Sequence, residues 1–235
     1  MDDADLDALA KLRAETFVSR THPAPIHIIE DFLPPEMRDL VLEGLVRDEG
    51  AFFSNRTDGR DALVAIDPEP VRSVIAEFEH RFDDVVATLT RLGAPTEDID
   101  GCHFETPSVT AAGHASFHSP HIDNDPLSGV SAVVTRRISF VWHAFREPRS
   151  FEGGELRLWD YADIPSDRGP WTPASTWTDH PCRDNTLIAF SSYSLHEVLP
   201  VRAPNGPFSG RRFAVVTAAH AGSPSIATSM TTPSA

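Results

Sequence analysis

The sequence predicts a mainly β domain with flanking helices, an α+β fold in which an antiparallel double-sheet jelly roll carries N-terminal helices packed on one sheet. Helical spacing of apolar residues is confined to the first part of the chain. From about residue 99 onward, short apolar or alternating stretches follow one another, separated by Pro, Gly, Asp and Asn. The length of 235 residues suits one sizeable domain.

Three segments have helical patterns. Residues 2–17 predict a weakly amphipathic helix, and residues 34–47 open with two prolines and a glutamate, which suit a first helical turn. Residues 69–92 predict the longest helix, and we expect its apolar stripe to pack on a sheet. The stripe consists of Val71, Val74, Ile75, Phe78, Phe82, Val85, Val86 and Leu89.

The strands are predicted from the remaining apolar stretches. An early strand covers residues 26–29. The later candidates are 102–110, 115–123, 136–145, 154–159, 186–190, 196–201 and 211–219. We therefore divide the chain into a support region of the same domain (1–98), a β-rich core (99–220) and a polar tail rich in Ser, Thr, Ala and Pro (221–235).

Composition narrows the possible partners and location. The chain has 35 acidic and 20 basic residues, a net charge of −15, which disfavours nucleic acid and anionic membrane surfaces. No apolar run approaches the roughly 20 residues of a membrane span, and the acidic start is unlike a signal peptide. Two cysteines, Cys102 and Cys182, cannot form a disulfide framework. We expect a cytoplasmic protein.

A cluster of candidate metal ligands begins with His121 and Asp123. On a strand these residues share a face, with Cα atoms about 6.6 Å apart, so an imidazole and a carboxylate can converge on one metal ion. Taken alone, this short triplet is weak evidence, because a surface loop gives the same pattern. His196, which opens a later strand, is a third candidate ligand.

An arginine opens the last apolar strand of the core. Arg212, Ala214 and Val216 share one face of that strand. A buried arginine is costly without an anionic partner, so Arg212 suggests an anion clamp beside the metal. A slip of one residue in register would give this position to Arg211 instead.

The order of motifs from about residue 100 to 220 resembles the 2-oxoglutarate- and Fe(II)-dependent dioxygenases, in their prolyl-4-hydroxylase-like branch. The N-terminal segment 28–34 is also similar to the entry of this branch. The matching pieces are Pro120–Asp123, Arg137–Val141, Gly153–Leu156, Asn185–Phe190, His196–Val201 and Gly210–Phe213. The resemblance implies a double-stranded β-helix, a variant of the jelly roll.

The resemblance also implies residue roles. His121, Asp123 and His196 match the iron ligands, and Arg212 matches the basic residue that binds the distal carboxylate of 2-oxoglutarate. The implied reaction consumes O2 and 2-oxoglutarate and releases succinate and CO2, with ascorbate as an expected stimulant. Because Asp123 is present where related halogenases have a small residue, hydroxylation or another oxidation is favoured over halogenation.

Several roles stay open. His143 lies where relatives often carry a tyrosine near the cosubstrate; it either touches 2-oxoglutarate or is a core histidine. His118 is expected at the pocket rim, and Asp125 is a poorer ligand candidate than Asp123. Two long loops could frame the pocket mouth, at residues 124–135 and 160–180.

The leading hypothesis is an enzyme that hydroxylates an amino acid, a peptidyl residue or a small natural product. One alternative is a zinc hydrolase that uses the same His-Asp-His set with a metal-bound water, which gives Arg212 no role. Another is a non-catalytic binding module on a jelly-roll scaffold. The expected partner is therefore a small-molecule or peptidyl substrate, and the sequence does not choose between them.

Overall fold

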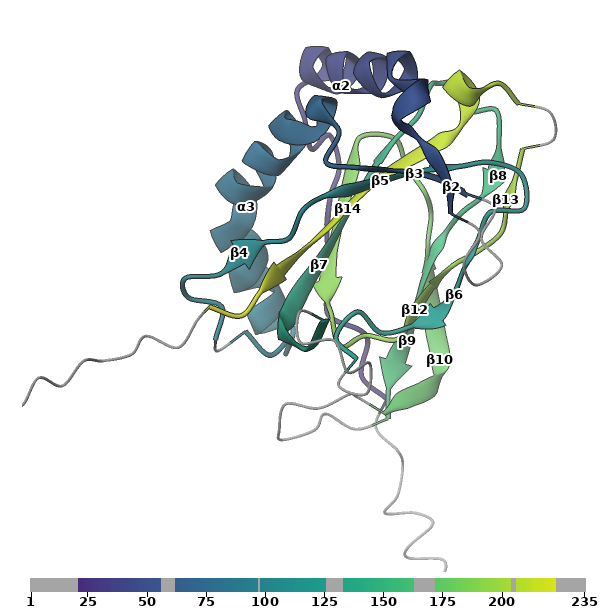
Figure 1. Cartoon of the computed structure of the whole chain (residues 1–235). Helices are drawn as coiled ribbons and strands as arrows, with labels where there is room; N and C mark the ends of the chain where they lie inside the picture. The colour runs from purple at the N-terminus through teal and green to yellow at the C-terminus, as the bar shows by residue number, and fades with distance from the viewer. Residues whose placement is uncertain are drawn as a thin grey trace, which may run out of the picture.

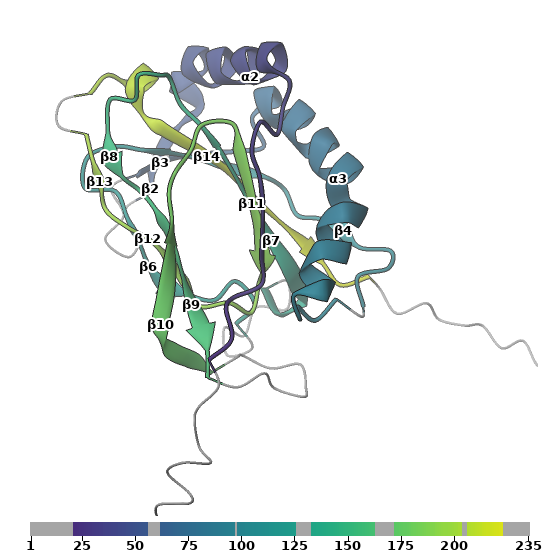
Figure 2. The same ribbon diagram turned by 180° about the vertical axis from the view of Figure 1, so that it is seen from behind.

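Two antiparallel β-sheets face each other in a computed structural model of the chain (Figures 1 and 2), which describes residues 21–55, 62–96, 98–125, 133–162, 172–203 and 206–222. The strands of the larger sheet, in spatial order, are β1 (Ile26–Ile29), β11 (Thr186–Ser191), β7 (Arg136–Ala144), β14 (Arg212–His220), β5 (Ser108–Ala112), β3 (Ala62–Ile66) and β2 (Phe53–Asn55), and β4 (His103–Phe104) pairs with β14. The smaller sheet has the order β10 (Pro173–His180), β9 (Leu156–Tyr161), β12 (His196–Val198) and β6 (His118–His121). A short ribbon pairs β8 (Glu152–Gly153) with β13 (Val201–Arg202). This arrangement confirms the predicted jelly roll.

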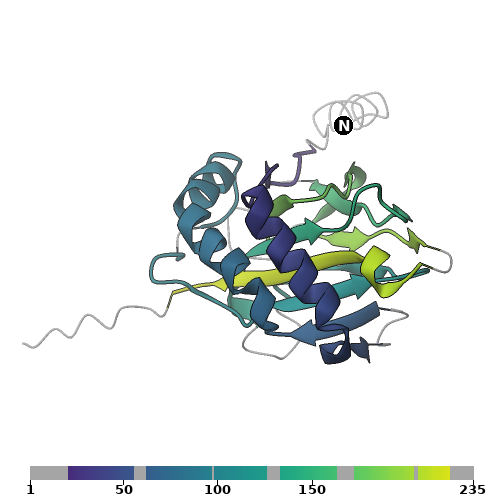
Figure 3. The same ribbon diagram turned by 90° about the horizontal axis from the view of Figure 1, so that it is seen from above.

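Two helices cover the outer face of the larger sheet. Figure 3 shows α2 (Pro35–Arg47) and α3 (Arg72–Arg91) lying across it. Phe78 of α3 stacks on Phe140 of β7, with ring centroids 5.4 Å apart, so the predicted stripe packs on the sheet. A 3-10 turn, Glu69–Val71, precedes α3. The helix predicted over residues 2–17 lies outside the described residues.

No helix among the described residues is both long and apolar enough to cross a membrane.

The alternation of side chains along β7 separates two cores. Trp142 and Phe140 pack outward against the helices, whereas Val141 and His143 point between the sheets. The inner core joins both sheets and consists of Ala24, Val141, Leu156, Leu158, Tyr161, Ile188, Phe190, Tyr193 and Ala214. Both faces of β7 are buried from Arg137 to Ala144, which suits the apolar run of Phe140, Val141 and Trp142 in its middle.

Asn185 ties the N-terminal segment to the core. Its side-chain amide donates to the Leu33 carbonyl (2.8 Å), and its Oδ1 accepts from the Leu33 N–H (3.1 Å) and from Trp142 Nε1 (3.2 Å). A backbone bond from Phe32 N–H to the Asn185 carbonyl (2.9 Å) completes the junction. β1 is thereby held in register at the edge of the larger sheet, against β11.

Two predicted strands are each broken by a proline. Residues 102–110 form β4 and β5, separated by a segment that contains Pro107, and residues 196–201 form β12 and β13, separated at Pro200. Proline has no N–H to donate to a strand ladder, so each break falls where pairing would fail. The strands predicted over 26–29, 115–123, 136–145, 154–159, 186–190 and 211–219 match β1, β6, β7, β9, β11 and β14 with small shifts in their ends.

Four strands escaped prediction, namely β2, β3, β8 and β10. The sequence of β3, Ala62–Ile66, is apolar at every position and too short to distinguish from other buried segments. The loop expected over 160–180 is wrong in its second half, because residues 173–180 form β10. This edge strand is rich in Ser, Thr, Asp and Pro and is mostly exposed, so its composition looks like that of a loop. The predicted domain limits at residues 98 and 220 stay predictions.

Candidate metal centre

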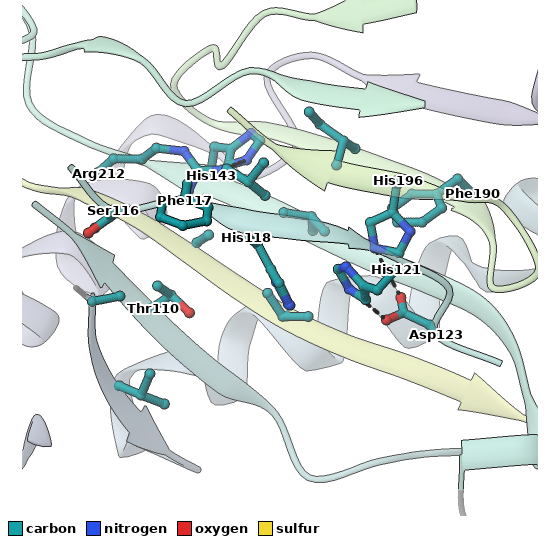
Figure 4. Close-up of a pocket in the computed structure, with 18 residues that line it drawn as sticks. Thr110, Ser116, Phe117, His118, His121, Asp123, His143, Phe190, His196 and Arg212 are labelled. Carbon is teal, nitrogen blue, oxygen red and sulfur yellow. Dashed lines mark hydrogen bonds and ion pairs between the residues drawn. The ribbon is translucent and has the colours of Figure 1, made fainter. Parts of the chain in front are cut away.

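The three predicted metal ligands meet at one point of the smaller sheet. His196 of β12 and His121 of β6 are direct partners across antiparallel strands, and Asp123 follows two residues after His121. Asp123 Oδ1 lies 3.5 Å from His121 Nε2, and its Oδ2 lies 3.6 Å from His196 Nε2. The potential ligand atoms all lie within 4.8 Å of one another, and Figure 4 shows the three side chains converging.

Backbone carbonyls orient both imidazoles. His121 Nδ1 lies 2.8 Å from the Ser119 carbonyl, and His196 Nδ1 lies 2.9 Å from the Ser194 carbonyl. A carbonyl oxygen only accepts, so each Nδ1 carries the hydrogen and donates it. In the neutral ring, each Nε2 then has a lone pair directed at the other members of the cluster, which is how metal-binding histidines are oriented in proteins.

The charges of the cluster suit a divalent cation. Burial lowers the pKa of His196 to about 4, although Asp123 acts in the opposite sense, so this imidazole is neutral near pH 7. Burial alone would raise the pKa of Asp123, but His196, His121 and the Ser139 hydroxyl outweigh it and hold that pKa below its usual range. Two imidazoles and an ionised carboxylate form the donor set typical of facial Fe(II) sites, so the residues fit that metal.

A buried arginine lies at the other end of the same pocket. Arg212 is 3% exposed, and its Nη2 donates to His143 Nε2 (2.7 Å) while its Nε donates to Cys182 Sγ (3.3 Å). Burial and then the adjacent guanidinium lower the pKa of His143 well below its ordinary value, so His143 is neutral. Among the described residues no carboxylate lies within 4.0 Å of Arg212. Its positive charge is therefore uncompensated and suits an anionic ligand.

Local backbone geometry gives Arg212 its space. Gly154 has φ +78°, and a Cβ at this position would lie 3.0 Å from Arg212 Cδ. Arg211, the other candidate, points elsewhere: its Nη1 donates to the Ala111 carbonyl (3.2 Å) and its guanidinium lies over the Phe208 ring. Arg212, and not Arg211, therefore lines the pocket that contains the candidate metal ligands.

One pocket contains both groups. Its volume is about 130 Å³, and Figure 4 shows Arg212 and His143 at one end and the His-Asp-His cluster at the other. The remaining lining residues are Ala62, Val64, Thr110, Ala112, Ser116, Phe117, His118, Val141, Leu156, Phe190, Val198, Ala214 and Val216. The walls are mainly apolar, so they reduce the screening of charges inside.

Other candidates take secondary positions. His118 lines the pocket, and its ring stacks on that of His121 with centroids 3.8 Å apart. Asp125 does not line the pocket, and neither do the described parts of the loops expected at 124–135 and 160–180.

Sequence reasoning missed three features of the site. Ser139, whose hydroxyl donates to Asp123 Oδ2 (2.5 Å), lies two and four residues before Val141 and His143, on the inward face of β7. This two-residue spacing along a strand was the sequence signal that could have placed Ser139 in the pocket. No sequence signal identified Cys182 or the pocket wall formed by β3, because both contact segments that are distant in sequence.

The comparison with protein families agrees with this geometry. Residues 107–220 match the sequence model of the 2OG-Fe(II) oxygenase superfamily. These residues belong to that superfamily. The 2OG-Fe(II) oxygenase segment includes β5 to β14 and every candidate ligand named above, and the family implies Fe(II), 2-oxoglutarate and O2. The resemblance predicted from the motifs is confirmed.

A curated relative is similar to part of the chain. The chain is 31% identical over 113 residues to an uncharacterized PKHD-type hydroxylase from Synechocystis sp.. The match covers 46% of this chain and 33% of that protein, so the chain spans about a third of the length of the relative.

Solved structures share the fold at low sequence identity. A prolyl-4-hydroxylase from Pseudomonas putida has a TM-score of 0.54 at 18% identity, over 85% of this chain and 94% of that one. A prolyl hydroxylase from Trichoplax adhaerens, in complex with a peptide fragment of the hypoxia-inducible factor oxygen degradation domain, has a TM-score of 0.56 at 15% identity, over 94% of both chains. The fold is therefore the double-stranded β-helix of the prolyl-4-hydroxylase-like branch, as predicted.

Proposed function

We propose that this protein is an Fe(II)- and 2-oxoglutarate-dependent dioxygenase that hydroxylates an unactivated C–H bond of an amino acid, a peptidyl residue or a small natural product, with release of succinate and CO2. The observation that carries this proposal is the presence, in one pocket, of a metal-binding set and an uncompensated guanidinium. A ligand that both chelates a metal and carries a distant carboxylate suits these two groups together.

His121, Asp123 and His196 would hold the iron. When bound, the iron and the cosubstrate supply the activation of O2 and the oxidation of the C–H bond. The chain itself orients both imidazoles through their Nδ1–H bonds, and burial keeps His196 neutral. Because Asp123 is present, the protein supplies a third ligand itself, which favours hydroxylation over halogenation.

Arg212 would bind the distal carboxylate of 2-oxoglutarate through charge-assisted hydrogen bonds. His143 supports this role by accepting from Arg212 Nη2, which fixes the plane of the guanidinium. A neutral His143 with Nε2 as acceptor carries its hydrogen on Nδ1, a buried atom that has no partner among the described residues. We assign His143 to the cosubstrate end of the pocket, as the residue that orients Arg212.

The apolar walls would surround the reacting part of the substrate. Phe190, Val198 and Val216 line the pocket and exclude water around an alkyl group. The Trichoplax adhaerens hydroxylase is in complex with a peptide fragment, which supports keeping peptidyl residues among the substrate classes. A zinc hydrolase on the same scaffold would leave Arg212 without a role, so we do not favour it.

Formation of succinate tests the proposal. The purified protein is incubated with Fe(II), ascorbate and 2-oxoglutarate, and screened against free amino acids and proline-containing peptides. We expect substrate-dependent succinate, stimulated by ascorbate and abolished in His196→Ala, with Arg211→Gln as a matched control that retains activity. Retained turnover in His196→Ala would contradict the assignment.

A further inference from the structure

A buried hydroxyl holds one oxygen of Asp123. Ser139 Oγ lies 2.5 Å from Asp123 Oδ2, and Ser192 Oγ lies 2.8 Å from Ser139 Oγ. Ser139 is 1% exposed and Ser192 is fully buried. The two serines come from β7 and from the residue after β11, in the larger sheet, whereas the imidazoles stand on the smaller one.

The direction of these hydrogen bonds follows from chemistry. An ionised carboxylate only accepts, so the single hydroxyl hydrogen of Ser139 goes to Asp123. Ser139 then has only lone pairs to offer, and Ser192 must donate to it. The result is a one-way chain that runs from Ser192 through Ser139 to the carboxylate.

Backbone hydrogen bonds hold both ends of this series of hydrogen bonds in place. Ser192 N–H donates to the Arg137 carbonyl (3.0 Å), and the Ser192 carbonyl accepts from the N–H of Asn124 (2.8 Å). The Asn124 side chain, 2% exposed, donates to the Val134 and Arg136 carbonyls at 3.1 and 2.5 Å. The residue beside Asp123 is thus anchored to the strand that carries Ser139, which leaves the carboxylate little freedom to rotate.

We propose that Ser139 is a positioning residue that reserves Oδ2 of Asp123 for a hydrogen bond and leaves Oδ1 for the metal. The two oxygens lie equally near the imidazoles, at 3.5 and 3.6 Å, and the Ser139 hydroxyl, which bonds Oδ2, is what distinguishes them. This inference rests on the proposed function. A carboxylate that binds through one oxygen occupies one coordination position, whereas one that binds through both occupies two. A facial triad with a single carboxylate oxygen leaves room for a chelating ketoacid and O2.

Metal affinity measured without turnover tests this role. Co(II) is titrated into metal-free protein by calorimetry, and 2-oxoglutarate is then titrated into the Co(II)-loaded protein. We expect Ser139→Ala to weaken Co(II) binding about 10- to 100-fold, the usual effect of losing a partner of a metal ligand. We also expect 2-oxoglutarate to bind more weakly to the loaded variant, although Arg212 is untouched.

Two further variants separate positioning from packing. Ser139→Thr keeps the hydroxyl and should restore most of the Co(II) affinity. Ser192→Ala removes only the second bond of the chain and should weaken Co(II) binding by about two- to tenfold, the effect of one hydrogen bond. If Ser139→Ala does not fold, as judged by circular dichroism, Ser192→Ala carries the test alone.

Unchanged Co(II) and 2-oxoglutarate affinities in Ser139→Ala, or in Ser192→Ala where that variant stands alone, would overturn the inference. A Ser139→Thr variant that folds yet binds Co(II) as weakly as Ser139→Ala would also overturn it. Failure of the proposed function looks different: the unaltered protein would then bind Co(II) but not 2-oxoglutarate, and the effect of Ser139 on metal affinity would still be measurable.

Discussion

Replacement of Arg212 by glutamine removes the only cation described in the pocket lining and leaves the metal ligands in place. An ion pair at about 4 Å and an effective dielectric constant of about 20 is worth roughly 4 kcal/mol. Removal of one partner of a buried pair costs about 2–5 kcal/mol. We therefore expect Arg212→Gln to weaken 2-oxoglutarate binding by roughly 30- to 4000-fold.

Calorimetric titration of 2-oxoglutarate into Co(II)-loaded protein measures this loss. Co(II) affinity should stay within about twofold, because Arg212 contacts His143 and Cys182 and none of the ligands. Arg211→Gln is the matched control, since that side chain points away from the pocket. Unchanged 2-oxoglutarate affinity in Arg212→Gln, or an equal loss in Arg211→Gln, would refute the assignment of the clamp.

Three other outcomes are expected. Asp123→Ala should abolish Co(II) binding and succinate formation, whereas Asp125→Ala should preserve both; the reverse would move the metal site. Trp142→Ala should lower the free energy of unfolding in urea by about 3–5 kcal/mol, because this side chain is fully buried, while Trp177→Ala, at a position 48% exposed, should change it by less than about 0.5 kcal/mol. Burial and the neighbouring guanidinium keep His143 neutral in the folded protein, so the unfolded chain binds more protons below about pH 6.5. The melting temperature should therefore fall as the pH is lowered from 8 to 5, and less steeply in His143→Phe; equal slopes would contradict this.

The sequence was most informative where chemistry and strand period coincide. His121, Asp123 and His196 could be predicted because their residue types suit a metal site and the two-residue spacing of the first two suggests a shared strand face. In the structure β6 ends at His121 and Asp123 follows it, yet the three side chains still meet. Arg212 could be predicted because an inward arginine on an apolar strand needs an anion. The long helix was equally readable, since its apolar stripe repeats at helical spacing over five turns.

Features that depend on pairing between distant segments were not predictable. β3 forms a pocket wall only because it pairs with β5. The sequence around β3 contains no pattern that indicates this pairing. β10 pairs with β9 through a polar, exposed edge whose composition is typical of a loop. Cys182 meets Arg212 thirty residues away in the chain. In each case the deciding energy comes from tertiary contacts, which outweigh intrinsic preference.

The two halves of the pocket belong to different sheets, with the imidazoles on the smaller and the guanidinium on the larger. Apolar side chains packed between the two sheets, among them Leu158, Ile188 and Phe190, form one buried cluster that joins the sheets. A ligand that contacts both groups bridges the two sheets, so its length must match the distance between the metal site and the guanidinium. A substitution that changes the volume of these apolar side chains should therefore alter the spacing of the two sheets. It should weaken ligand binding while leaving every polar group of the pocket intact.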